Sequence, residues 1–158
     1  MSDKTLLRID GEVETPERLS FEDLAALEES LQVRGVLRGG KPLGDAVLLS
    51  GLLNRVGAKP SAQYIGLHSS TDDFHASIPL EPVRELALLV YRINGQPLDA
   101  KGGGPLRFFI PDYAACHTEE IDECANVKFV DYIELTAAKG FDNRPQDDEE
   151  HEQLHQRE

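Results

Sequence analysis

The residues best suited to chemistry gather between positions 94 and 128. Residues 101–107 read KGGGPLR, a run of three glycines that ends at Arg107. Glycines let a backbone pass close to a ligand or adopt φ angles that other residues avoid. The run lacks the Gly-Lys-Ser/Thr of a P-loop and does not fit the GxGxxG pattern of dinucleotide-binding proteins. Taken alone, it predicts a tight connection between two strands, with a ligand-binding loop as the alternative.

Both cysteines of the chain, Cys116 and Cys124, lie in the same stretch, and His117 follows the first. Seven residues separate the two thiols, whereas zinc sites usually space paired cysteines by roughly two to four. The pattern favours two buried packing thiols. A reversible disulfide stays open if the Cα atoms lie within about 7 Å, and so does a small metal or redox site made of Cys116, His117 and Cys124.

Other polar side chains give weaker signals. His68 and His75 fall on or near predicted strands, where a histidine is usually an ordinary core or surface group whose hydrogen bonds are satisfied. We find no Ser-His-Asp order, and the carboxylates are too numerous to single out a catalytic pair. The residue types alone therefore predict no catalytic residue.

The length and the net charge restrict the classes of protein to which this chain can belong. The 158 residues fit one domain, expected to span residues 1–140, with an acidic and disordered tail at 141–158. A net charge of −13 disfavours nucleic acid and anionic membranes as partners. No apolar run is long enough to cross a membrane, and the first residues lack the apolar core of a signal peptide. From these features we expect a cytoplasmic protein.

The elements that must position these residues follow from hydrophobic spacing and turn residues. Ser20 is a suitable N-cap for a helix that runs to about Leu31, and a second helix is predicted over 45–56, with Gly57 at its end. Strands are predicted over 5–13, 31–37, 63–68, 74–79, 86–93, 106–110 and 127–136. The 86–93 strand is apolar enough to be buried on both faces, and Asn94-Gly95 predicts a tight turn after it. The fold class is therefore α+β, with mixed β-sheets and a few helices.

The order of these motifs resembles that of a known family. A buried strand is followed by NGQPL, a glycine loop, PLR and a strand, then P-x-Y, and finally NVK and a strand that ends in IEL. AVLLSGLL at 46–53 and DFHASIPL at 73–80 add to this order. Together they resemble the oxidoreductase molybdopterin-binding domain, the catalytic domain of sulfite oxidases and plant-type nitrate reductases. The resemblance covers about residues 5–137 and implies a sulfite oxidase-like fold.

Transferred motif by motif, the resemblance points to three cofactor-binding residues. The arginine of the family's H-G-x-P-x-R motif falls on Arg107, its glycine on Gly103, and the lysine of a V-K motif on Lys128. In the family the two cations help to hold an anionic pterin cofactor, a role that suits a planar guanidinium. The histidine of the first motif falls on Gly102, so that contact is absent here.

One departure from the family pattern concerns the residue that binds the metal. Active family members place a cysteine before the second helix, and its thiolate binds molybdenum as a soft ligand. Residues 31–44 of this chain contain no cysteine, and Cys116 and Cys124 lie much later. Our first hypothesis is therefore a divergent molybdopterin-binding domain whose cofactor binding or redox activity is altered or lost. The alternatives are a non-catalytic scaffold for a protein partner and a thiol or metal site at Cys116 and Cys124.

Overall fold

The structure, a computed structural model, describes residues 5–38, 40–70, 73–99, 101, 103–111 and 127–143. Its strands are β1 (Thr5–Gly11), β2 (Glu17–Ser20), β3 (Gln32–Arg38), β4 (Lys41–Leu48), β5 (Tyr64–Ser69), β6 (Phe74–Pro79), β7 (Leu88–Ile93), β8 (Gln96–Pro97), β9 (Arg107–Phe109) and β10 (Tyr132–Thr136). Its helices are α1 (Phe21–Ala25), the 3-10 turn η1 (Glu29–Leu31) and α2 (Leu49–Val56). This mixture of strands and a few helices confirms the predicted α+β class.

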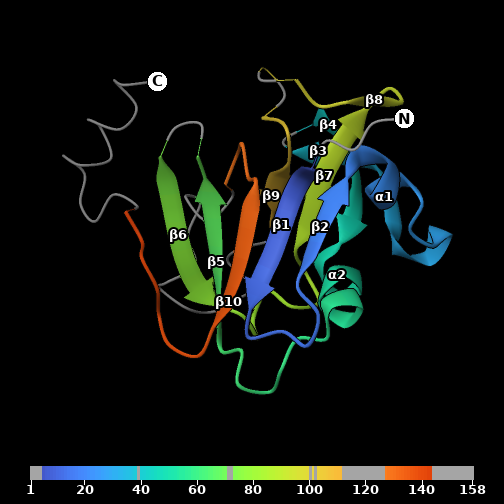
Figure 1. The fold of residues 1–158 in the computed structure, drawn as a ribbon. Helices are drawn as coiled ribbons and strands as arrows, with labels where there is room; N and C mark the ends of the chain where they lie inside the picture. The colour runs from blue at the N-terminus through green and yellow to red at the C-terminus, as the bar shows by residue number, and fades with distance from the viewer. Residues whose placement is uncertain are drawn as a thin grey trace.

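The strands form two sheets. The first sheet has the order β2-β1-β10-β5-β6, and the second has the order β3-β4-β7-β8, with β9 also paired to β7. Figure 1 shows the five strands of the first sheet side by side, with the second sheet behind its β1 and β2 end. In the first sheet β1 and β10 run parallel, so the two ends of the described chain meet at its centre. That pairing aligns side chains that are more than 120 positions apart in the sequence.

The main core lies between the two sheets and α2. It contains the inward side chains of β1, β5 and β10, together with Leu52, Leu53 and Tyr91. A smaller cluster covers the other face of the second sheet and includes Leu88 and Val90. Alternate residues of β7 therefore face different clusters, which confirms the prediction of a strand buried on both faces. The turn after β7 is confirmed too, with positive φ angles at Asn94 and Gly95.

The predicted start of the first helix and the predicted end of the second helix are both confirmed. The Ser20 side chain accepts a hydrogen bond from the Asp23 amide, and Asp23 accepts one from the Ser20 amide, which makes a reciprocal capping box. Gly57 ends α2 in the left-handed conformation, with φ at +67°. The first helix is shorter than predicted, however, because α1 ends at Ala25 and the chain enters η1 before β3.

The predicted helix over 45–56 is wrong in its first third. Residues 45–48 belong to β4, and only Leu49–Val56 forms α2. An unbroken apolar run fits a strand buried on both faces as well as it fits a buried helix. Pairing with β3 and β7 decides the outcome, since it places Ala46 and Val47 in opposite clusters.

The predicted strand over 127–136 is also too long. Phe129 has φ at +59°, a left-handed conformation that interrupts an extended strand, and β10 begins only at Tyr132. Before that point the chain is held by other bonds, from the Phe129 amide to the Gly103 carbonyl and from the Val130 amide to the Leu106 carbonyl. The break thus joins the segment around Lys128 to the glycine loop.

The tail predicted at 141–158 falls mostly outside the described residues. Residues 140–143 run beside β6, where Asp142 accepts a hydrogen bond from the Ser77 amide and Asn143 accepts one from the His75 amide. Among the described residues, no helix is both long and apolar enough to span a membrane.

Candidate functional site

The three residues predicted to bind a cofactor come together in the structure. Gly103 has φ at +89°, and its carbonyl accepts a hydrogen bond from the Phe129 amide. A second bond, from the Phe108 amide to the Val127 carbonyl, ties β9 to the residue before Lys128. The glycine loop, Arg107 and Lys128 are therefore fixed to one another by backbone hydrogen bonds. We call Gly103, Arg107 and Lys128 the Gly103 cluster.

Gly103 is the point at which the two cationic side chains meet. A Cβ atom placed on Gly103 would lie 3.3 Å from Cδ of Arg107 and 3.4 Å from Cγ of Lys128. Arg107 is half-buried and Lys128 is exposed. The aliphatic stems of both cationic side chains thus pack against the buried Gly103, where any larger residue would crowd them. An anionic group suits this arrangement, because guanidinium and ammonium groups donate strong charge-assisted hydrogen bonds to oxyanions.

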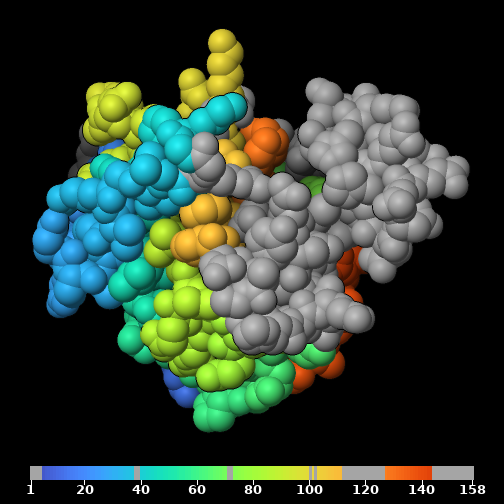
Figure 2. Space-filling model, turned by 180° about the vertical axis from the view of Figure 1, so that it is seen from behind, coloured from blue at the N-terminus to red at the C-terminus, as the bar shows by residue number. Residues whose placement is uncertain are grey.

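Around the Gly103 cluster, the second sheet provides the support. β9 pairs with β7, and Phe109 shares the smaller apolar cluster with Val36 and Leu43 of the β3–β4 hairpin. Seen from behind, the gold segment around β9 lies beside the cyan residues of that hairpin (Figure 2). The hairpin is also the stretch where the family resemblance predicts a metal-binding cysteine. Residues 31–44 contain none.

Cys116, His117 and Cys124 lie outside the described residues, so the proposed thiol or metal site stays a prediction. Within the described ranges, no group of three or more histidine, cysteine or carboxylate side chains is arranged to hold a metal ion.

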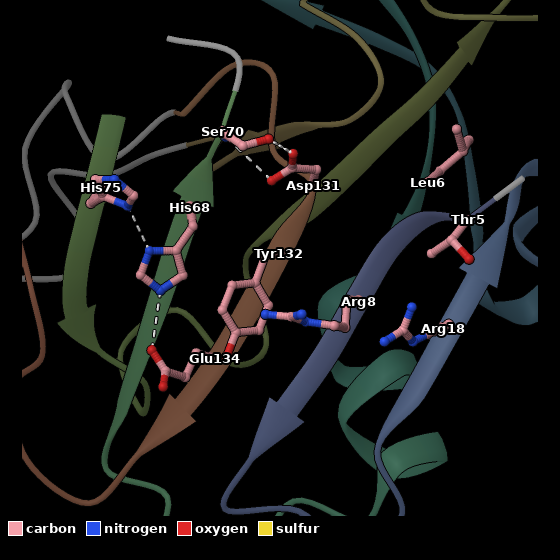
Figure 3. Close-up of a pocket in the computed structure, with 10 residues that line it drawn as sticks. All are labelled: Thr5, Leu6, Arg8, Arg18, His68, Ser70, His75, Asp131, Tyr132 and Glu134. Atoms are coloured by element: carbon pink, nitrogen blue, oxygen red, sulfur yellow. Dashed lines mark hydrogen bonds and ion pairs between the residues drawn. The ribbon is translucent and has the colours of Figure 1, made fainter. Parts of the chain in front are cut away.

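A second polar cluster was missed by sequence reasoning. Five side chains, one from each strand of the first sheet, lie in direct register across its outer face. We call this row the polar rung, and it consists of His75, His68, Tyr132, Arg8 and Arg18. It lines a pocket of about 510 Å³, and Figure 3 shows the row of side chains along the sheet.

Contacts along the polar rung are close. The rings of His68 and Tyr132 stack with centroids 4.9 Å apart, and the Arg8 guanidinium carbon lies 3.9 Å from the Tyr132 centroid. The Tyr132 hydroxyl donates to Asp10. Burial, together with that carboxylate, raises the pKa of Tyr132 to about 12. Tyr132 is therefore a neutral spacer between the histidines and the arginines.

His68 and His75 form a hydrogen-bonded pair between two carboxylates. Their Nδ1 atoms are 2.8 Å apart, so one ring must donate a proton to the other. Nε2 of His68 lies 3.2 Å from Glu134, and Nε2 of His75 lies 2.8 Å from Asp73. Ionised carboxylates only accept, so both Nε2 atoms must also carry protons.

Burial lowers the pKa of His68 below 6.5, and the neighbouring His75 lowers it further, although Glu134 acts in the opposite direction. His68 therefore stays neutral, donates to Glu134 through Nε2 and accepts from His75 through Nδ1. Gly66 makes room for this ring, since a Cβ there would lie 2.9 Å from Nε2 of His68.

We predict that this pair makes stability depend on pH. Between the folded pKa of His68 and 6.5, the unfolded chain binds a proton at His68 that the folded chain does not. The free energy of unfolding should therefore fall on acidification through that window, by up to about 1.4 kcal/mol per pH unit from this group. His68→Gln should reduce the fall, as measured by urea unfolding at pH 7.5, 6.5 and 5.5. Equal losses in the wild type and the variant would contradict the prediction.

One signal in the sequence could have found the pair. His68 and His75 each stand two residues from the 70–73 connection between β5 and β6, so a hairpin without slippage places them opposite each other. The arginines offered no such clue, because Arg8 meets Tyr132 only through the parallel pairing of β1 and β10.

Comparisons with known proteins agree on one family. Residues 45–142 match the family model of the oxidoreductase molybdopterin binding domain. An uncharacterized oxidoreductase of Bacillus subtilis, YuiH, is 32% identical over 111 residues, which are 66% of this chain and 56% of that protein. The sulfane dehydrogenase SoxCD of Paracoccus pantotrophus has a similar fold, with a TM-score of 0.60 and 20% identity over 85% of this chain and 39% of that chain. This chain thus spans only part of either relative.

Proposed function

Because this chain belongs to the oxidoreductase molybdopterin-binding domain family, we propose that its Gly103 cluster holds the anionic part of a molybdopterin-type cofactor. The observation that carries the proposal is the meeting of Arg107 and Lys128 at Gly103, where a Cβ would come within 3.3–3.5 Å of both side chains. The resemblance of the PLR and NVK motifs to those of the family leads to the same residues from the sequence alone.

Each residue has a separate task in this proposal. Arg107 presents a planar fork of N–H donors that can bind two oxygens of one phosphate. Lys128 adds a compact positive charge from the opposite side of the loop. Gly103, which has no side chain, lets the stems of both cations pack against the loop. When bound, the cofactor would supply a redox-active metal centre, and the chain's own residues would fix its anionic end.

We further propose that redox activity is altered or lost relative to active family members. The support is in the sequence, because residues 31–44 contain no cysteine where the family resemblance predicts the thiolate ligand of molybdenum. The β3–β4 hairpin formed by these residues packs beside β9. A thiolate is a soft, strongly donating ligand, and residues 31–44 supply none.

Binding of molybdopterin released from a donor enzyme tests the proposal. Native mass spectrometry of the purified chain should show one cofactor per chain. Gly103→Ala should weaken binding by about tenfold or more, because its methyl group would crowd Arg107 and Lys128 and displace both side chains. A chain that shows no adduct at saturating molybdopterin would overturn the proposal.

The matched control is Gly40→Ala. Gly40 has φ at +82°, close to the +89° of Gly103, but a Cβ there meets no atom within 4 Å. The free energy of unfolding should fall by a similar amount in both variants, about 1–2 kcal/mol, because alanine disfavours positive φ. Only Gly103→Ala should lose affinity for molybdopterin. Equal affinities of the two variants would show that the space beside Gly103 is not the binding site.

A role as scaffold for a protein partner stays a prediction. The described residues expose three large hydrophobic side chains, Leu37, Leu86 and Phe141, which lie in three separate segments of the chain. Scattered apolar residues of this kind are common on protein surfaces and do not mark an interface.

A further inference from the structure

The pocket on the first sheet has a positively charged end that neither the family nor the Gly103 cluster explains. Arg8 and Arg18 are directly opposite each other on the antiparallel strands β1 and β2. Like charges in that position repel, because their Cβ atoms are only about 5 Å apart. Figure 3 shows the Arg18 side chain directed toward Arg8, with both reaching across the sheet. The fold therefore brings two cations together and needs something to offset their repulsion.

Neighbouring carboxylates do not neutralise Arg18. Glu17, its neighbour in β2, forms an ion pair with Arg55 of α2, and Asp10 is shared between Arg8 and the Tyr132 hydroxyl. In the part of the chain that the structure describes, Arg18 makes no ion pair, and its side chain is exposed. This is unexpected in a chain with 29 acidic residues and 16 basic ones.

The carboxylates on the far side of the pocket are occupied as well. Asp131 accepts hydrogen bonds from the amide and hydroxyl of Ser70, and Glu134 accepts one from His68. These acceptors are thus held on their own side of Tyr132, away from the arginines. Among the described residues that line the pocket, the Arg8 and Arg18 end carries no carboxylate, and Asp10 nearby pairs with Arg8.

We propose that this end of the pocket binds an oxyanion group, such as a sulfate, phosphate or carboxylate, between Arg8 and Arg18. Adjacent strands are about 4.8 Å apart, so both guanidinium groups can reach one tetrahedral or planar anion. Arg8 is already oriented by its contact with Tyr132 and its ion pair with Asp10 at 3.5 Å. The pocket volume of about 510 Å³ admits a ligand considerably larger than the oxyanion itself.

Titration with sulfate tests this site without a confounding change of ligand charge, since sulfate stays a dianion from pH 5 to 8. The side-chain N–H signals of the arginines and the ring signals of Tyr132 are followed by NMR at constant ionic strength in chloride. We expect saturable shifts at Tyr132 and at both arginines. Arg18→Ala should weaken binding by about tenfold, and Arg18→Lys should weaken it less. Shifts that grow linearly without saturation would overturn the proposal.

Two control variants keep this site apart from the Gly103 cluster. Arg84→Ala removes an arginine from a different part of the surface and should leave sulfate binding unchanged. Lys128→Ala should also leave it unchanged, although it removes a cation from the proposed cofactor site. Sulfate binding that is lost in Lys128→Ala and kept in Arg18→Ala would refute the pocket site while leaving the proposed function standing. Phosphate and acetate titrations then rank the oxyanion classes.

Discussion

Gly44→Ala is expected to lower the free energy of unfolding by about 3 kcal/mol. Gly44 has φ at +128°, and a Cβ atom on it would lie 2.1 Å from the carbonyl oxygen of Arg92 in β7. That oxygen belongs to the backbone of a central strand, so it cannot rotate away as a side chain would. Either β4 or β7 must shift, and both strands are part of the second sheet that supports β9.

Neighbouring contacts make such a shift more costly. Asp45 accepts a hydrogen bond from the Gly35 amide at 3.0 Å and one from Arg92 Nε at 3.1 Å. Moving the backbone at position 44 would displace this carboxylate from both partners. The strain at Gly44 therefore spreads to the β3–β4 hairpin and to β7 at once.

Gly35→Ala is the matched control, because it lies on the same hairpin and also has a positive φ of +68°. A Cβ there meets no atom within 4 Å. Gly35→Ala should lower the free energy of unfolding only by the intrinsic penalty of the left-handed conformation, about 1–2 kcal/mol. Urea unfolding of the two variants at pH 7.5 compares them directly. Equal losses of unfolding free energy in the two variants would contradict the prediction that the Arg92 carbonyl leaves no room for a side chain at position 44.

Local patterns predicted the parts of the fold that depend on neighbours in sequence. The N-cap at Ser20, the helix end at Gly57 and the Asn94-Gly95 turn all follow from short-range chemistry, and all three are confirmed. The division of 45–56 into β4 and α2 could not be read in this way. The apolar residues on both sides of Leu48 look alike, and only the pairing of β4 between β3 and β7 separates them.

The two polar clusters show the same limit. Gly103, Arg107 and Lys128 were found because a motif order resembled that of a family, and the structure brings these residues together. The polar rung was missed because its members come from five strands whose register is set by long-range pairing. Only His68 and His75 carry a local signal, through their symmetry about one turn.

Removing both cations of the Gly103 cluster is expected to have the largest effect on cofactor binding. A hydrogen bond to a charged group contributes about 1.5–3 kcal/mol, so Arg107→Ala or Lys128→Ala alone should weaken molybdopterin binding by roughly 10- to 100-fold. The double variant should weaken it further, but by less than the product of the two factors if both cations hold one anionic group. Isothermal titration with molybdopterin gives all four dissociation constants of this cycle.

Two features of the Gly103 cluster make the cycle informative. Lys128 is exposed, so its removal should leave the free energy of unfolding within about 0.5 kcal/mol of the wild type. Arg107 is half-buried on β9, so Arg107→Lys is needed beside Arg107→Ala to keep the charge while removing the planar fork. We expect intermediate affinity for the lysine variant, because one ammonium group cannot donate to two oxygens in the fixed geometry of a guanidinium.

Matched surface variants decide whether the loss is specific to this site. Lys41→Ala and Arg84→Ala remove the same charges from residues other than the two whose side chains lie nearest to Gly103. In a chain whose net charge is −13, every lost cation raises the general repulsion of an anionic cofactor. That long-range effect should be shared by all four single variants, whereas contact with the cofactor belongs only to Arg107 and Lys128. If Lys41→Ala weakens binding as much as Lys128→Ala does, the cation at Gly103 acts through net charge alone and the proposed contact is wrong.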